Sequence, residues 1–170
     1  MCIRDSDSRT RSEIDEFSTS GFIGVKKVGH DNYELAVPDS KQVIESVTSE
    51  SVCELARSFG WTVAKRPIKY EEIKDFEEVM AAGTAAALVP IKSITMHSRN
   101  DKFTFLDEEP GPLCMKLLTT LQGIQRGKIA DTFGWCSKVE APDAYGYHSK
   151  EAPAPANANG NPMESISQLP

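Results

Sequence analysis

The sequence lacks the residue patterns that hold metals or build disulfide frameworks. It has no CxxC pair, and neither its four cysteines nor its three histidines follow a regular spacing. We therefore expect reduced thiols and no bound metal. No apolar run approaches the length of a membrane-spanning helix, and no signal peptide is visible. Basic residues are also few, 19 against 25 acidic ones, and the net charge of -6 disfavours nucleic acid as a partner.

The signatures of several large enzyme classes are missing as well. The chain contains no Walker loop, no GxGxxG, no HExxH and no Ser-His-Asp arrangement that spacing would support. Lys26 and Lys27 precede a predicted hairpin turn. Paired lysines in that position more often protect a solvated strand edge, so we reject them as Schiff-base candidates.

What the chain does have is enough length and apolar content for one domain, at 170 residues and 39% hydrophobic. Residues 1–12 are polar and aperiodic, and we expect them to be disordered. Their beginning, MCIRDS, is typical of an assembly artefact, so we expect the native N-terminus to be missing. The domain is predicted over residues 13–140, and a flexible Pro/Ala/Asn-rich tail over 141–170. A soluble protein is expected, and cytoplasm, mitochondrion and plastid all stay open as its compartment.

Alternating apolar residues and turn formers predict a β-hairpin early in the domain. A strand is expected at residues 22–25, a turn at 29–32 and a return strand at 33–37. Further along, residues 61–64 alternate like a strand, and residues 70–76 predict a short acidic helix.

Two helices follow from apolar spacing. The first is capped by Thr48 or Ser49 and ends at Gly60; the second opens at Gly111-Pro112 and ends before Gly127. Their predicted apolar faces are Val52, Leu55, Ala56 and Phe59 in the first helix, and Cys114, Leu117, Leu118 and Leu121 in the second.

Residues 81–90, AAGTAAALVP, form the stretch around which we expect the domain to be organised. A Gly-Thr-Ala turn among small residues can hold an anion against bare backbone N–H groups. The same letters also fit a tight turn that enters a buried strand, which is the commoner structure. We predict a strand buried on both faces at 85–91, a turn at 94–101 and a short edge strand at 103–106.

Three places could carry chemistry. The helix start at residues 46–49 offers free N–H groups and hydroxyls to a phosphate, or is an ordinary N-cap. Glu16 could keep a ring nitrogen protonated. It could equally be a surface acid, as the neighbouring Glu13 and Asp15 suggest. Thr84 and Ala85 could offer a hydroxyl and N–H groups to an anion.

Taken together and in this order, these pieces resemble the C-terminal part of branched-chain amino acid aminotransferases, which are fold-type-IV pyridoxal-phosphate enzymes. The resemblance rests on residues 14–22, 47–56, 83–86, and 111–127 with 134–135, and covers about 13–139. It implies an α/β (α+β) fold, the C-terminal large domain of these enzymes, truncated at its N-terminal side.

The resemblance also implies a role for each candidate residue. Glu16 would bind the pyridine nitrogen of pyridoxal 5'-phosphate, and Thr19 would lie near the ring. The phosphate would be held by Val47 and Thr48, joined by Thr84, and the substrate carboxylate would be received by Thr84 and Ala85.

The sequence departs from the family pattern at three points. Gly21 stands where an asparagine is usual, Glu45-Ser46 replaces a Pro-Gly pair, and Ser49 replaces a frequent arginine. The Schiff-base lysine of the family lies further upstream than this chain extends. We therefore assign no catalytic residue and expect no transamination by this polypeptide alone.

For the full-length protein, the resemblance implies exchange of amino groups between branched-chain amino acids and 2-oxoglutarate, giving glutamate, by a homodimer. One alternative is a D-amino acid aminotransferase or an aminodeoxychorismate lyase of the same fold. Another is a non-catalytic module that keeps the fold without the chemistry.

Overall fold

The computed structural model of the chain describes residues 3–4 (backbone only), 12–96, 99–106, 109–137 and 139. The chain divides into two units, Met1–Thr132 and Phe133–Pro170, and every described helix and strand belongs to the first. The predicted tail at 141–170 and most of the predicted disordered start lie outside the described residues. In chain order the elements are β1 (Ile3–Arg4), β2 (Glu13–Ile14), β3 (Glu16–Phe17), β4 (Ser20–Lys27), β5 (Tyr33–Val37), α1 (Val47–Ser58), β6 (Thr62–Lys65), β7 (Ile68–Lys69), the 3-10 helix η1 (Tyr70–Asp75), β8 (Glu78–Gly83), β9 (Ala87–Pro90), β10 (Ser93–Met96), β11 (Asp101–Thr104) and α2 (Pro112–Gln125).

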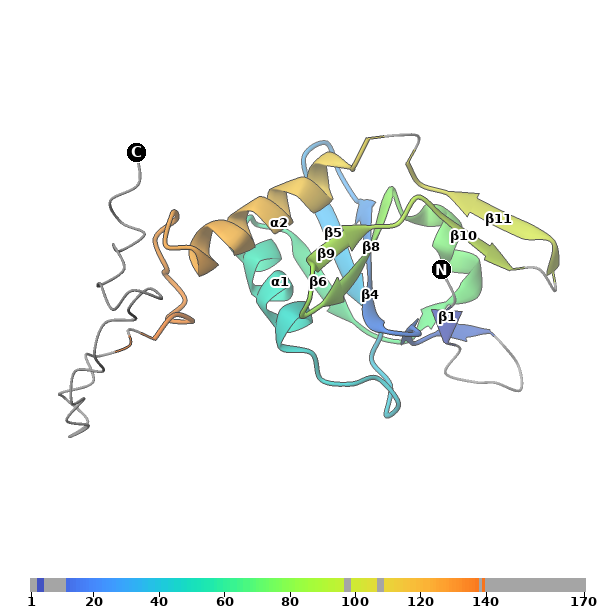
Figure 1. The fold of residues 1–170 in the computed structure, drawn as a ribbon. Coiled ribbons are helices and arrows are strands. Elements are labelled where there is room, and N and C mark those ends of the chain that lie inside the picture. The colour runs from blue at the N-terminus through green and yellow to red at the C-terminus, as the bar shows by residue number, and fades with distance from the viewer. Residues whose placement is uncertain (1–2, 5–11, 97–98, 107–108, 138, 140–170) are drawn as a thin grey trace, which may run out of the picture. The chain divides into compact units, whose positions relative to one another are not determined.

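A seven-stranded sheet forms the centre of the first unit, and β4 is its most connected strand (Figure 1). One edge of β4 pairs with β8, which in turn pairs with β9. The other edge pairs first with β3 and then with β5, which runs parallel to β6. The predicted hairpin at 22–37 is thereby confirmed as β4 and β5, and the predicted strand at 61–64 as β6.

The two faces of this sheet are covered by different elements. A Cβ built on Gly21 would lie 3.0 Å from Ser49 Oγ of α1, whereas one on Gly24 would lie 2.7 Å from the ring of Phe76, just after η1. Since side chains alternate along a strand, positions 21 and 24 point to opposite faces. The helices therefore cover one face, and η1 with a core that includes Phe17 and Phe22 covers the other.

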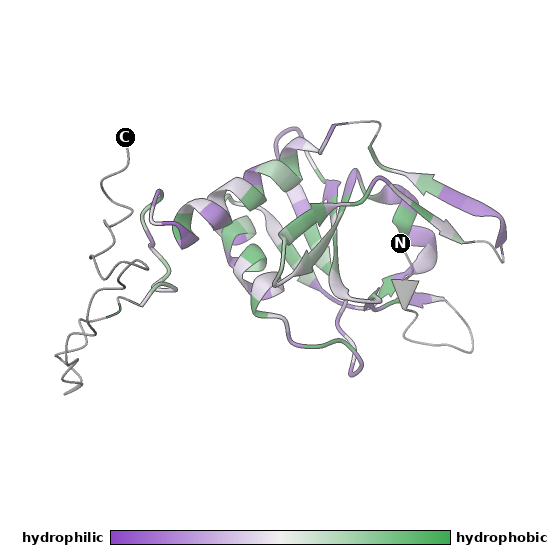
Figure 2. Cartoon of the chain, viewed as in Figure 1, coloured by the Kyte–Doolittle hydropathy of each residue, from purple (hydrophilic) through white to green (hydrophobic). Residues whose placement is uncertain are grey.

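Both predicted helices are confirmed. In α1 the buried apolar residues are Val52, Cys53, Leu55 and Ala56, and in α2 they are Leu113, Cys114, Leu117, Leu121 and Ile124. Figure 2 shows apolar and polar residues alternating along both helices, as one-sided burial requires. Gly60 and Gly127 follow the helix ends with φ of 80° and 66°, which glycine adopts without a Cβ clash. Within the described residues, neither helix is long and apolar enough to span a membrane.

The prediction for the organising stretch was partly wrong. The turn at Thr84 is present, but β9 after it alternates in burial, with Val89 43% exposed, and is not buried on both faces. The strand with that property is β8 before the turn, whose residues from Glu78 to Ala82 are all buried. The reason is pairing: β8 has a neighbour on each edge, while β9 pairs with β8 alone.

The predicted turn at 94–101 was also wrong. Residues 93–96 form β10, which pairs antiparallel with β11, and β11 begins two residues before the predicted strand. Ile94 is 1% exposed, and Met96 and Phe103 pack against the same core cluster. Burial of these side chains against η1 favours a β10–β11 hairpin, which the local sequence pattern did not predict.

Candidate functional site

The Glu16 segment and the beginning of α1 both lie next to Gly21. On β4, Gly21 lies opposite Glu16 of β3 and opposite Ala82 of β8. Paired residues on antiparallel strands direct their side chains to the same face. That face is the one on which Gly21 meets Ser49, so Glu16 and the beginning of α1 lie on the same side of the sheet.

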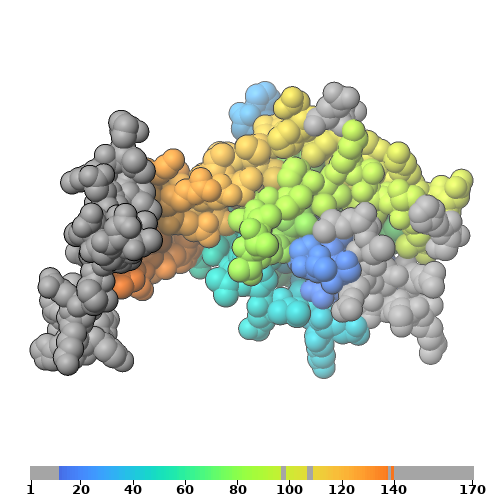
Figure 3. All heavy atoms as spheres, viewed as in Figure 1, coloured from blue at the N-terminus to red at the C-terminus, as the bar shows by residue number. Residues whose placement is uncertain are grey.

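The two predicted turns lie at one end of this sheet. Thr19 is in the exposed turn between β3 and β4, and Thr84 and Ala85 are in the exposed turn between β8 and β9. A Cβ built on Gly83 would lie 3.7 Å from Ser20 Cβ, so the two turns are neighbours. In Figure 3 the blue segment near the start of β4, the cyan segment before α1 and the lime segment of the β8–β9 turn adjoin on one face.

Helix α1 begins at least two residues earlier than its predicted caps, Thr48 or Ser49, allow. Ser46, in an extended conformation, is the N-cap and accepts the N–H of Ser49 at 3.2 Å; Thr48 and Ser49 do not serve as the cap. In the described part of the chain, the N–H groups of Val47 and Thr48 have no hydrogen-bond partner. Two free N–H groups at the positive end of a helix suit an anion.

Asp15 contradicts the interpretation of its segment as a row of surface acids. Asp15 is only 3% exposed, and Ser40 Oγ donates a hydrogen bond to its Oδ1 at 2.7 Å. Glu16 itself is half-buried at the edge of the same segment. The alternation of a strand could have suggested this difference, but the partner Ser40 lies 25 residues away and no local pattern points to it.

The hydroxyl of Ser20 is a buried polar group that the sequence analysis did not single out. Its Oγ is buried and has no hydrogen-bond partner among the described residues. A buried hydroxyl left unpaired costs roughly 1–3 kcal/mol, so such an atom marks a place where a ligand or another segment supplies a partner. Ser20 follows the β3–β4 turn and, since side chains alternate along β4, points to the opposite face from Gly21.

A cavity of about 690 Å³ lies beside the beginning of α1. Of the six predicted site residues, Val47 alone lines it. The lining also includes Gly21 and Ser49, two of the positions that depart from the family pattern. Its other residues are Phe22, Val37, Pro38, Asp39, Ser40, Lys41, Val43, Ile44, Glu45, Ser46, Glu50, Cys53 and Lys65.

Two of the charged residues that line the cavity, Lys65 and Glu50, form an ion pair. Lys65 donates a hydrogen bond to Glu50, which lowers the pKa of that carboxyl. Burial raises the pKa of the Cys53 thiol to about 11, so it is no nucleophile at neutral pH. Lys26, rejected above as a Schiff-base lysine, forms an ion pair with Glu34 at 2.9 Å.

The fold is that of a class IV aminotransferase domain. Residues 9–94 match the amino-transferase class IV family, and the chain belongs to that family. Class IV aminotransferases depend on pyridoxal 5'-phosphate, and the free N–H groups at the beginning of α1 fit its phosphate.

Relatives and solved structures agree with this assignment. The chain is 53% identical over 138 residues to the aminotransferase atnJ of Emericella nidulans, covering 79% of this chain and 40% of that protein. It is 47% identical over 138 residues to the branched-chain amino acid aminotransferase gloG of Glarea lozoyensis, covering 80% and 38%. The branched-chain amino acid aminotransferase of Thermobaculum terrenum in its PLP form is similar in structure, with a TM-score of 0.58 and 26% identity over 71% of this chain and 36% of that chain. The chain thus spans about two fifths of the length of these relatives.

Proposed function

We propose that the protein carrying this chain is a transaminase that moves the amino group of a branched-chain amino acid to 2-oxoglutarate. The observation that carries the proposal is the meeting of Glu16, the beginning of α1 and the Thr84 turn at one end of the sheet. The names of the Glarea and Thermobaculum proteins support the substrate class.

In this proposal each predicted residue has a separate task. Bound pyridoxal phosphate supplies an electron sink for negative charge at the substrate Cα. Glu16 accepts a hydrogen bond from the pyridine nitrogen and favours its protonated state, because opposite charges stabilise each other. Thr19 borders the ring.

The anionic groups of the ligands are assigned to backbone and hydroxyl donors. The N–H groups of Val47 and Thr48, with the hydroxyls of Thr48 and Thr84, hold the phosphate. Thr84 and Ala85 orient the substrate carboxylate. The Schiff-base lysine, which removes the Cα proton, and a second subunit are assigned to the longer protein, as a homodimer.

The test uses the complete product of the gene that carries this chain. Purified with pyridoxal phosphate, it should form glutamate from 2-oxoglutarate and leucine, isoleucine or valine. Activity only with D-alanine, or pyruvate release from aminodeoxychorismate, would identify the same-fold alternatives. No turnover and no cofactor absorbance would identify a non-catalytic module.

Two variants test the assigned residues. Glu16→Ala should lower kcat/KM at least about a hundredfold, because it removes the carboxylate that keeps the pyridine nitrogen protonated. The unfolding midpoint should change little. Glu77→Ala, an exposed carboxylate on the same domain, is the matched control. Thr84→Val should weaken pyridoxal-phosphate binding. Wild-type turnover in the first variant, or wild-type affinity in the second, would remove that residue from the site.

A further inference from the structure

We propose that Asp15 and Ser40 are a pair of positioning residues that holds the loop before α1 against the strand segment that carries Glu16. The inference rests on the proposed function, since it explains how two assigned segments keep a fixed separation. Neither residue touches the reacting groups in this scheme, and both act through the elements that they join.

Asp15 occupies a junction in the fold. It is the single residue between β2 and β3, where the chain leaves the β2–β7 pair and enters the seven-stranded sheet. The residue after it is Glu16. A carboxylate that is 97% removed from solvent needs hydrogen-bond donors, and the donor here is Ser40 Oγ at 2.7 Å. Any shift of Asp15 therefore moves the residue next to it.

Ser40 occupies the corresponding junction on the other segment. Backbone pairing of β5 with β6 continues as far as Asp39, whose N–H donates to the carbonyl of Arg66 at 3.2 Å. Ser40 is the first residue beyond that pairing. Its Oγ accepts the N–H of Gln42 at 3.2 Å, and its carbonyl accepts the N–H of Val43 at 3.3 Å. One residue thus shapes the first turn of the loop and ties it to Asp15.

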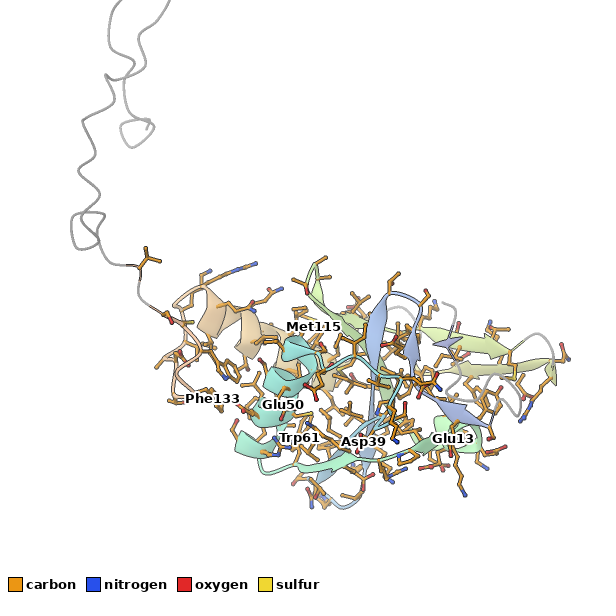
Figure 4. The ribbon with its side chains drawn as sticks, turned by 90° about the horizontal axis from the view of Figure 1, so that it is seen from below. Glu13, Asp39, Glu50, Trp61, Met115 and Phe133 are labelled. Atoms are coloured by element: carbon orange, nitrogen blue, oxygen red, sulfur yellow. The ribbon has the colours of Figure 1, made fainter. Side chains whose placement is uncertain are left out.

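The loop leads directly to the proposed phosphate donors. Five residues separate Ser40 from the N-cap Ser46, and Val47 and Thr48 follow. In Figure 4 the labelled Asp39 lies between Glu13, at the β2 end, and Glu50 of α1, which follows the path of this tie. Ser40, Lys41 and residues 43–46 of the loop also line the 690 Å³ cavity.

A hydroxyl bound to a carboxylate is a strong tether for its size. Hydrogen bonds to charged groups are about twice as strong as neutral ones, and the acceptor of this one, Asp15, is buried. Its loss leaves Asp15 buried without that donor and frees the loop around Lys41, which is exposed. The first turn of α1, which also packs against Gly21 through Ser49, then loses this additional link to the Glu16 segment.

The experiment compares Ser40→Ala with Ser58→Ala in the complete protein. Ser58 Oγ donates to the carbonyl of Leu55 at 2.7 Å at the far end of α1, so the control loses an equally short hydroxyl bond away from the tie. Two quantities are measured. One is the rate of tryptic cleavage after Lys41 in the cofactor-free protein, followed by mass spectrometry. The other is the dissociation constant of pyridoxal phosphate, followed by fluorescence.

Ser40→Ala should raise both the cleavage rate and the dissociation constant about tenfold, while Ser58→Ala leaves both within about twofold. Ser40→Thr keeps a hydroxyl, has room in the cavity, and should restore both values. Asp15→Asn should act in the same direction as Ser40→Ala. Equal effects in Ser40→Ala and Ser58→Ala, or no rescue by Ser40→Thr, would overturn the pair.

The two readouts separate this inference from the proposed function. A wild-type protein that binds no pyridoxal phosphate contradicts the proposed function. The cleavage rate still tests whether the Asp15–Ser40 hydrogen bond holds the loop. Faster cleavage with unchanged cofactor affinity contradicts the positioning role and leaves the function standing.

Discussion

Glu78 shows what a single buried carboxylate does in this fold. It is 4% exposed on β8, and it accepts the N–H of Leu113 and the N–H of Cys114 at 2.9 Å each. These are N–H groups of the first turn of α2, where the N-cap Gly111 has no side chain to offer. A Cβ on Gly111 would come within 2.1 Å of the Glu78 carboxyl. The carboxyl can therefore approach the helix start only because residue 111 is a glycine.

Glu78→Ala should lower the free energy of unfolding by about 2–4 kcal/mol, because two buried N–H groups lose a charged acceptor and a cavity remains. Urea denaturation of the variant beside Glu77→Ala measures this. Glu77 is the exposed neighbour, and its substitution should change the free energy of unfolding by less than about 0.5 kcal/mol. Equal effects at both positions would contradict the capping role.

At the scale of elements, the helices followed from local sequence far better than the strands did. Apolar spacing located α1 and α2, and glycines located their ends. Burial on both faces was predicted for β9 but is found in β8, because an apolar run looks alike in sequence whether it lies at the edge or in the middle of a sheet. Ser46 was missed as the cap because Thr48 and Ser49 have equally suitable side chains.

The first turn of α1 gives a prediction at this scale. Ser46→Ala removes the oxygen that accepts the Ser49 N–H and should lower the free energy of unfolding by about 1 kcal/mol. Ser51→Ala, whose hydroxyl only donates to the carbonyl of Val47 within the helix, should change it little. Thermal unfolding of both variants distinguishes the cap from a general effect of lost hydroxyls.

At the scale of the whole molecule, ion pairs join different elements of the first unit. Arg66 binds Glu72 through two hydrogen bonds, of 3.1 and 2.8 Å, and Lys65 binds Glu50. The hydrogen bond from Lys65 lowers the pKa of Glu50. Partial burial alone would raise the pKa of Glu72, but the hydrogen bonds from Arg66 and the Lys69 N–H outweigh it and lower that pKa as well.

These shifts set the direction of acid sensitivity. A carboxyl whose pKa is lower when folded stabilises the fold above its unfolded value, here the ordinary 4.5, and loses that contribution as pH falls through the folded value. Urea midpoints should therefore drop as the pH is lowered below about 4.5. The drop should be smaller in Glu72→Gln and in 0.5 M salt, because these pairs are partly exposed. A midpoint that is unchanged by acid would contradict the ion-pair contribution.

The sequence by itself determined both helices and the β4–β5 hairpin, because these depend on periodicity and turn residues within about fifteen positions. The class of fold followed from the resemblance of four segments, in order, to the fold-type-IV enzymes. Only the tertiary structure decided that Glu16, Gly21 and Ala82 lie side by side, that Asp15 is buried against Ser40, and that Glu78 caps α2. Strand register and helix docking decide each of these contacts. The residues involved are far apart in the sequence, so no local pattern predicts which side chains will be partners.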